Sequence, residues 1–166
     1  MATRGMSVSP AHAEYIVKKT GTKAKIDVLR AGVEPSRFEI SKNHGDKTRY
    51  AYVGKVDFNR DVDKLPEAVI SRNGSLRIIG SGDALEPLKR KWKGHPDIEI
   101  RESESSEMIP AILSEADIGL LPMPDEDIWR IASPLKLAEY AAAGLLVAGI
   151  EHDGHINCGP WYDELQ

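Results

Sequence analysis

Apolar and polar positions follow two periods along most of this 166-residue chain. From Tyr50 onward, short apolar runs of strand length alternate with amphipathic stretches of about 10 to 15 residues that have helical periodicity. Strands in such an alternation are buried on both sides, because helices cover both faces of the sheet. The pattern therefore predicts an α/β fold with a doubly wound, Rossmann-like parallel sheet. The predicted strands are residues 50–56, 75–81, 98–102, 117–123 and 145–150, and the predicted helices are 63–72, 84–93, 107–115 and 134–144.

The residues before Tyr50 have a different pattern. Ser9 followed by Pro10 is typical of an N-cap and a first helical residue, and the helix is expected to end near Gly21. A short strand is expected at residues 25–32. Residues 34–49 have little periodicity and many turn-forming residues, so we interpret them as a loop or linker.

Length and composition are those of one globular domain with a single core. The chain is 41% hydrophobic and 29% charged, and its formal net charge of -4 predicts no nucleic-acid partner. Cys158 has no second cysteine for a disulfide, so we predict a cytoplasmic location. No apolar run approaches the roughly 20 residues that span a bilayer, so any membrane association of the full-length protein is expected to be peripheral.

Candidate binding residues lie where the predicted strands end. In an open α/β sheet, ligands bind at the carboxyl ends of the strands, near helix N-termini whose free amides suit anions. Gly54 ends one strand, and Lys55 and Arg60 follow on the next turn. Two cations at such a turn are suited to clamp a diphosphate, since each charge-assisted hydrogen bond contributes roughly 1.5 to 3 kcal/mol. The alternative is a solvated surface pair.

The next predicted strand ends in a Gly-x-Gly turn formed by Gly80 and Gly82. Glycines at this place let a ligand approach the backbone closely, whereas the alternative is a tight turn without a ligand. A dinucleotide fingerprint needs a third glycine where Leu85 stands, so the turn does not favour hydride transfer.

The stretch SPLKLAEY opens the last predicted helix. Ser133 is expected to be the N-cap and Pro134 the first helical residue, with Lys136 and Glu139 on one helical face. Lys136 and the helix N-terminus are suited to phosphate, and Glu139 is suited to the hydroxyl groups of a ribose. The alternative is a capped helix with an ion pair between Lys136 and Glu139.

Other motifs add little. The sequence has no G-x-S-x-G elbow and no Walker loop, so it lacks the usual motifs of hydrolases and NTPases. The HDGH stretch at residues 152–155 favours a loop over a site, and Trp129, just before SPLK, could form one wall of the candidate site. The histidines show no metal-ligand spacing; they are His12, His44, His95, His152 and His155.

Together these turns resemble the nucleotide-sugar-binding half of the GT-B glycosyltransferases, specifically the large family 4 of retaining enzymes. The resemblance covers residues 9–153, although Ala31 stands where the family usually has asparagine. It rests on segments in the same order and spacing as in the family, namely KIDVLRAGVEPSRF, YVGKVDFNRDVDKLPEAV, LRIIGSGDALEPLKR, IPAILSEADIGLLPM and SPLKLAEYAAAGLLVAG.

The resemblance implies a role for each candidate residue. Lys55 and Arg60 are expected to stabilise the diphosphate during catalysis, and Glu139 to hold the ribose hydroxyls. Base selectivity is expected to come from the backbone near residues 100–103. The donor is expected to be a UDP-, GDP- or other NDP-sugar, with no metal or other cofactor. The remaining residues implied to contact the donor are Gly54, Gly80, Gly82, Ser133, Pro134, Leu135 and Lys136.

Two departures from the family pattern bear on function. Ile131 stands where many members have a first glutamate, eight residues before the second, so the usual contact to the donor sugar is missing. The family also places an acceptor-binding domain before this one. Residues 1–166 are therefore expected to form a single nucleotide-sugar-binding domain, with 1–24 as a remnant of the interdomain junction.

The sequence thus predicts the donor-binding domain of a retaining glycosyltransferase that is inactive without its N-terminal acceptor-binding domain. Two alternatives stay open. One is a non-catalytic module that binds a nucleotide sugar and acts through partners, and the other is a domain like that of a sugar-nucleotide epimerase.

Overall fold

The computed structural model describes residues 3–40, 45–156 and 162–164, with side chains described up to residue 155. His44, Cys158 and Trp161 lie outside these ranges. The main body is a six-stranded sheet with the strand order β5-β4-β3-β6-β7-β8, and all its pairings are parallel. The strands are β3 (Arg49–Lys55), β4 (Ser75–Ser81), β5 (Ile98–Arg101), β6 (Ile118–Leu121), β7 (Leu146–Gly149) and β8 (Tyr162–Glu164).

This strand order confirms the predicted doubly wound α/β fold. The first strand of this sheet, β3, lies in its middle. The next two strands, β4 and β5, are added on one side of β3, and β6, β7 and β8 are then added on the other side. The strand order reverses between β3 and β6, and doubly wound sheets in general bind ligands outside the carboxyl ends of their strands near such a point. Strand β3 is central and nearly continuous in its burial, as a strand covered on both faces must be.

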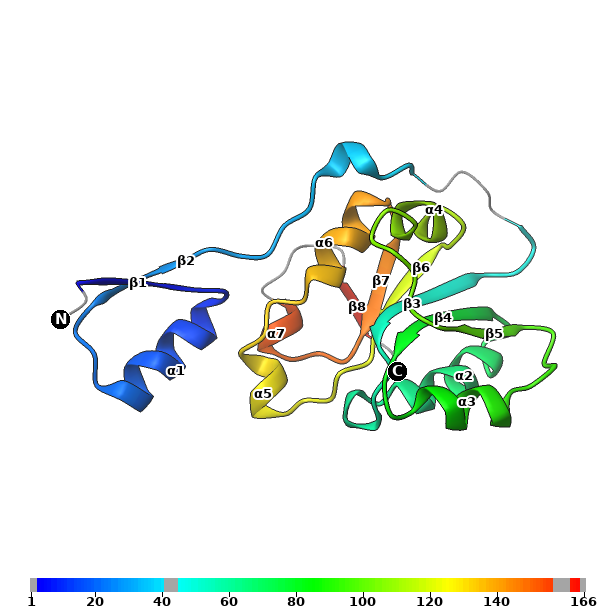
Figure 1. Cartoon of the computed structure of the whole chain (residues 1–166), viewed down its shortest axis with the longest axis horizontal. Helices are drawn as coiled ribbons and strands as arrows, with labels where there is room; N and C mark the ends of the chain where they lie inside the picture. Colours follow the sequence, from blue (N-terminus) through cyan, green and yellow to red (C-terminus); the bar gives the residue numbers. More distant parts are fainter. Residues whose placement is uncertain (1–2, 41–44, 157–161, 165–166) are drawn as a thin grey trace.

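Two helical layers cover the sheet (Figure 1). Helices α2 (Leu65–Ile70) and α3 (Leu85–Lys91) pack on one face, where Val69, Leu88 and Ile78 share a core. Helices α4 (Ile109–Leu113) and α6 (Leu135–Ala142) pack on the other, where Leu113, Tyr140 and Val147 share a second core. The second core fixes the height of α6 above the sheet, and α6 carries the predicted phosphate-binding residue Lys136.

The N-terminal residues form a separate β-α-β unit that lies apart from the main sheet in Figure 1. Strands β1 (Arg4–Ser7) and β2 (Lys25–Val28) pair in parallel beside α1 (Pro10–Thr20). The predictions for α1 are confirmed: the Ser9 hydroxyl accepts a hydrogen bond from the His12 amide at 3.0 Å, and Gly21 ends the helix with φ +64°. The sequence did not predict β1, which is four residues long and has no alternating pattern.

Several short elements were also not predicted. They are one-turn segments, and a single turn is too short to show a hydrophobic period. The short elements are the 3₁₀ turns η1 (Pro35–Arg37), η2 (Phe58–Arg60) and η3 (Val62–Lys64), and the helices α5 (Asp127–Arg130) and α7 (Asp153–Ile156). Helix α7 includes part of the HDGH stretch that was expected to be a loop.

Among the described residues no helix is both long and apolar enough to cross a membrane.

Candidate functional site

A cavity of about 300 Å³ opens at the carboxyl ends of β3 and β4. It contains four of the predicted residues, Gly54, Lys55, Gly80 and Lys136. Ser103 of the expected base-selecting segment also lines it, as does Glu104, which sequence reasoning did not single out although it lies three residues beyond the end of β5. The six remaining predicted residues are not part of this lining; they are Arg60, Gly82, Ser133, Pro134, Leu135 and Glu139.

Lys136 reaches from α6 across the end of β3. Gly54 has φ +149°, and a Cβ atom there would overlap the Cε and Nζ atoms of Lys136. Glycine is therefore required at position 54 so that the lysine can lie against the strand backbone. In the described part of the chain, Lys136 forms no ion pair with Glu139, so the alternative of a helix closed by that pair is wrong.

Burial is the main reason that the pKa of Lys136 lies below its usual range. The carboxylate of Glu139 opposes this shift, and the positive charge of Arg60 adds to it. Lys136 is thus a partly buried cation whose nearest charges do not neutralise it.

Arg60 lies in η2, above the face of an aromatic ring. Its guanidinium carbon is 4.5 Å from the centre of the Trp129 ring. Trp129 is not among the residues that line the cavity, so its expected role as one wall of the site stays a prediction. Its Nε atom is 3.7 Å from an oxygen of Asp57. Tyr52 lies below, where burial raises its pKa to about 12, and its hydroxyl donates to the Lys55 carbonyl at 2.5 Å.

Gly80 and Gly82 serve the packing of two neighbouring turns. A Cβ atom at Gly80 would overlap the Gly54 carbonyl oxygen, and one at Gly82 would overlap an oxygen of Asp57. The same turns are joined by hydrogen bonds, since the Asp83 amide donates to Asp57 at 3.3 Å and the Phe58 amide donates to Asp83 at 2.9 Å. Sequence reasoning missed both aspartates, although each lies two residues beyond a strand end, where such side chains cap turns.

The N-terminus of α6 differs from the prediction by one residue. Pro134 occupies the N-cap position with ψ 117°, and its side chain makes no capping bond. Ser133 as N-cap and Pro134 as first helical residue are therefore wrong, because the backbone of Pro134 is still extended and Leu135 is the first helical residue. The helix then places Leu135 and Lys136 in its first turn, with Glu139 one turn further on.

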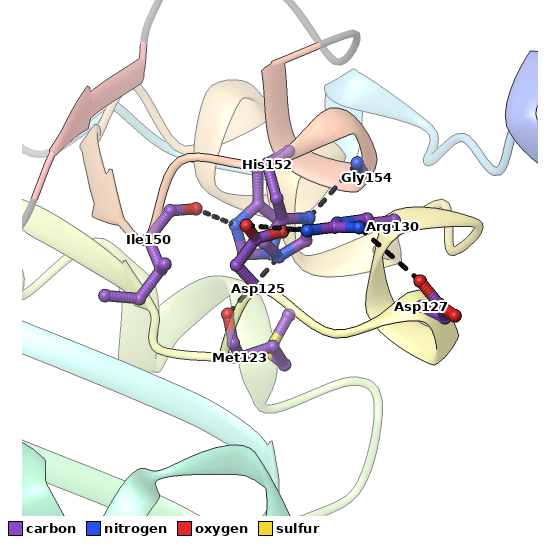
Figure 2. A network of polar contacts seen from close by, with 8 residues as sticks. Met123, Asp125, Asp127, Arg130, Ile150, His152 and Gly154 are labelled. Atoms are coloured by element: carbon purple, nitrogen blue, oxygen red, sulfur yellow. Dashed lines mark hydrogen bonds and ion pairs between the residues drawn. The ribbon is translucent and has the colours of Figure 1, made fainter.

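A polar network holds α5 in place beside the site (Figure 2). Arg130 binds Asp125 at 2.6 Å, and His152 contacts the Met123 carbonyl at 3.3 Å while accepting from the Gly154 amide at 3.2 Å. The His155 ring stacks on His152 with 3.8 Å between centroids, and burial lowers the pKa of His155 to about 4. In the part of the chain that the structure describes, no three His, Cys, Asp or Glu residues gather as a metal site would require.

Comparison with known proteins gives similarity in structure alone. No protein-family model and no curated protein matches the sequence. The sucrose-phosphate synthase of Thermosynechococcus elongatus aligns over 93% of this chain with a TM-score of 0.72 and 17% identity. The pneumococcal O-GlcNAc transferase GtfA, solved with UDP and GlcNAc, aligns over 90% with a TM-score of 0.63 and 15% identity.

A third similar structure is itself a single domain. The C-terminal domain of LpcC, a group 1 glycosyl transferase family protein from Francisella tularensis, aligns over 80% of both chains with a TM-score of 0.60 and 16% identity. By contrast, this chain spans 42% of the sucrose-phosphate synthase and 30% of GtfA. The fold of this chain is therefore that of the C-terminal domain of a GT-B glycosyltransferase.

Proposed function

We propose that this chain is the donor-binding domain of a glycosyltransferase and that it binds a nucleotide-diphosphate sugar in the cavity at the ends of β3 and β4. The observation that carries the proposal is the Lys136 ammonium group. It is partly buried, its pKa is lowered chiefly by burial, and it has no carboxylate ion pair among the described residues. A cation held in this state favours an anionic ligand, because the ligand supplies the charge that the protein withholds.

The surroundings of Lys136 suit a diphosphate. Lys55 lines the same cavity, and Arg60 is close enough to lower the pKa of Lys136. The first turn of α6 adds backbone amides that have no partner within the helix. Charge-assisted hydrogen bonds of this kind contribute roughly 1.5 to 3 kcal/mol each.

The same groups would assist the chemical step. When the bond between the anomeric carbon and the phosphate oxygen breaks, negative charge develops on the departing diphosphate, and Lys55, Arg60 and Lys136 would stabilise it. Glu139 would accept hydrogen bonds from the ribose hydroxyls. Retention of configuration rests on the resemblance noted above, which also implies that no metal is needed.

Transfer would also need an acceptor-binding domain outside this chain. We infer this second domain because the chain spans only part of the similar enzymes, for example 42% of the sucrose-phosphate synthase. The proposal places residues 1–24 at the junction with that domain. A cytoplasmic location and a peripheral contact with membranes stay predictions.

Calorimetric titration with UDP and with GDP tests the proposed function. We expect one-to-one binding of one of them, weakened roughly 10- to 100-fold in Lys136→Ala, since one strong charged contact is lost. Lys55→Ala and Glu139→Ala should also weaken binding. Lys93→Ala, which removes an exposed lysine outside the cavity, is the matched control. Absence of binding in the wild-type chain, or undiminished binding in both Lys136→Ala and Glu139→Ala, would refute the proposal.

A further inference from the structure

Trp129 is the residue whose position the proposed site leaves unexplained. It lies on α5, outside the cavity lining, and only 9% of its surface is exposed. Its indole ring faces the Arg60 guanidinium, with 4.5 Å between the guanidinium carbon and the ring centre. Trp129 belongs to the apolar core that includes Leu137 and Tyr140, and in addition it presents its ring face to a cation that is proposed to bind ligand.

Besides the Trp129 ring, Arg60 interacts with the side chains of Tyr52 and Asp57. The ion pair with Asp57 is long, at 3.7 Å between Nε and the carboxylate oxygen. The Nε atom is buried and has no hydrogen-bond partner among the described residues. Fixing a long side chain costs rotamer entropy, so each contact that holds Arg60, the ring face of Trp129 included, contributes to its placement. The attraction between a cation and an aromatic face strengthens when water is excluded, as it is around Trp129.

The backbone around Trp129 is also fixed by contacts with neighbouring segments. A Cβ atom at Gly154 of α7 would overlap the Trp129 carbonyl oxygen, so the two backbones are in close contact. In the network of Figure 2, Arg130 at the end of α5 binds Asp125, and Met123 before α5 contacts His152. On the side of the N-terminal unit, the buried Ser9 hydroxyl donates to the Ile131 carbonyl at 2.7 Å. The ring is therefore presented by a rigid backbone.

We propose that Trp129 is a positioning residue: its ring face holds the Arg60 guanidinium in the place from which it binds the diphosphate of a nucleotide sugar. This inference rests on the proposed function for its ligand. Its first step, the placement of Arg60, does not depend on any ligand. The two steps are therefore tested separately.

The placement of Arg60 is measured in the ligand-free chain by NMR of the arginine Nε–H groups. The ring current of Trp129 should shift the Arg60 signal upfield in the wild-type chain. Trp129→Phe retains an aromatic face and should retain most of the shift, whereas Trp129→Leu should abolish it. A wild-type signal at the position of a free arginine would overturn the inference, whatever the ligand proves to be.

The consequence for binding is measured with UDP or GDP, whichever the wild-type chain binds. Trp129→Leu should weaken binding roughly 3- to 10-fold, as expected for the loss of one cation–π contact. Trp129→Phe should remain close to wild type. In an Arg60→Ala background, Trp129→Leu should cause no further loss, because its effect acts through that arginine.

The outcomes separate the two proposals. If UDP and GDP both fail to bind the wild-type chain, the proposed function fails, and the NMR signal alone decides the placement of Arg60. If Lys136→Ala weakens binding but Trp129→Leu does not, or if Trp129→Leu and Arg60→Ala weaken it additively, the inference about Trp129 is wrong. Should Trp129→Leu fail to fold, Gly154→Ala replaces it. That substitution displaces Trp129 from behind, and an unchanged Arg60 signal in it would contradict the inference.

Discussion

Basic side chains lie at both ends of the main sheet, and the two ends differ in whether these side chains have carboxylate partners. At the amino ends of the strands, Arg49 binds Asp117 at 2.7 Å and Arg77 binds Glu99 at 2.6 Å. At the carboxyl ends, Lys55 and Lys136 share a cavity and form no ion pair with any described residue. The amino end also has a cavity, of about 170 Å³, but its arginines are already paired.

The difference between the two ends lies in the partners of the cations: those at the amino ends have carboxylate partners, and Lys55 and Lys136 have none among the described residues. The hydrogen bond that Arg49 donates to the Asp117 carboxylate is the main reason that the pKa of Arg49 is raised, which stabilises its charge. Burial lowers the pKa of Lys136, so its charge is destabilised until an anion binds. The amino-end pairs therefore contribute to stability, and the carboxyl-end cations are proposed to contribute to binding.

The largest effect is expected from breaking an amino-end pair. Asp117→Asn removes the negative charge that accepts bonds from the Arg49 amide and guanidinium. We expect a loss of about 2 to 3 kcal/mol in the free energy of unfolding, measured with urea, and unchanged affinity of the folded protein for UDP or GDP. Glu115→Gln is the matched control, because Glu115 is 61% exposed and Arg77 keeps Glu99. It should cost less than about 1 kcal/mol. A greater loss in the control would show that the comparison of the two ends is wrong.

A smaller loss of stability, accompanied by a loss of binding, is expected from Gly54→Ala. The new methyl group would displace the Lys136 side chain and strain a backbone at φ +149°. We expect a cost of about 1 to 2 kcal/mol in unfolding free energy and an affinity for the nucleotide as low as that of Lys136→Ala. Gly94→Ala separates the two causes, since Gly94 has φ +78° and open space around it. It should lower stability and leave binding intact; equal binding losses in both variants would contradict the role of Gly54.

The smallest effect is a pH dependence that arises from Lys136. Because its pKa is lowered in the free protein, nucleotide affinity should fall as pH rises through that pKa, by at most about tenfold per pH unit. Stability of the free protein should rise over the same range up to the ordinary lysine pKa, since the unfolded chain holds more protons there. Titrations at several alkaline pH values, with Lys136→Met as reference, measure this effect. The same slope in both proteins would assign the dependence to another group.

The hydrophobic pattern predicted the five main strands and their helices because short apolar runs and amphipathic stretches alternate regularly from Tyr50 onward. Elements of one turn, such as α5 and α7, show no such pattern, and they are the elements that carry or support Trp129. The boundary of α6 was wrong by one residue because the proline rule allows Pro134 on either side of a helix start. Backbone geometry in three dimensions decides between them.

The sequence by itself determined the fold class, the strand ends that carry Lys55 and Gly80, and the proximity of Lys136 to them. These features follow from local periodicity and from the rule that parallel strands end at one edge. Only the tertiary structure decided which cations are paired, that Gly80 and Gly82 are needed for packing of two turns, and that Arg60 lies on Trp129. Those contacts join residues far apart in the chain, and neither the period nor the spacing of a sequence records which side chains meet across a folded core.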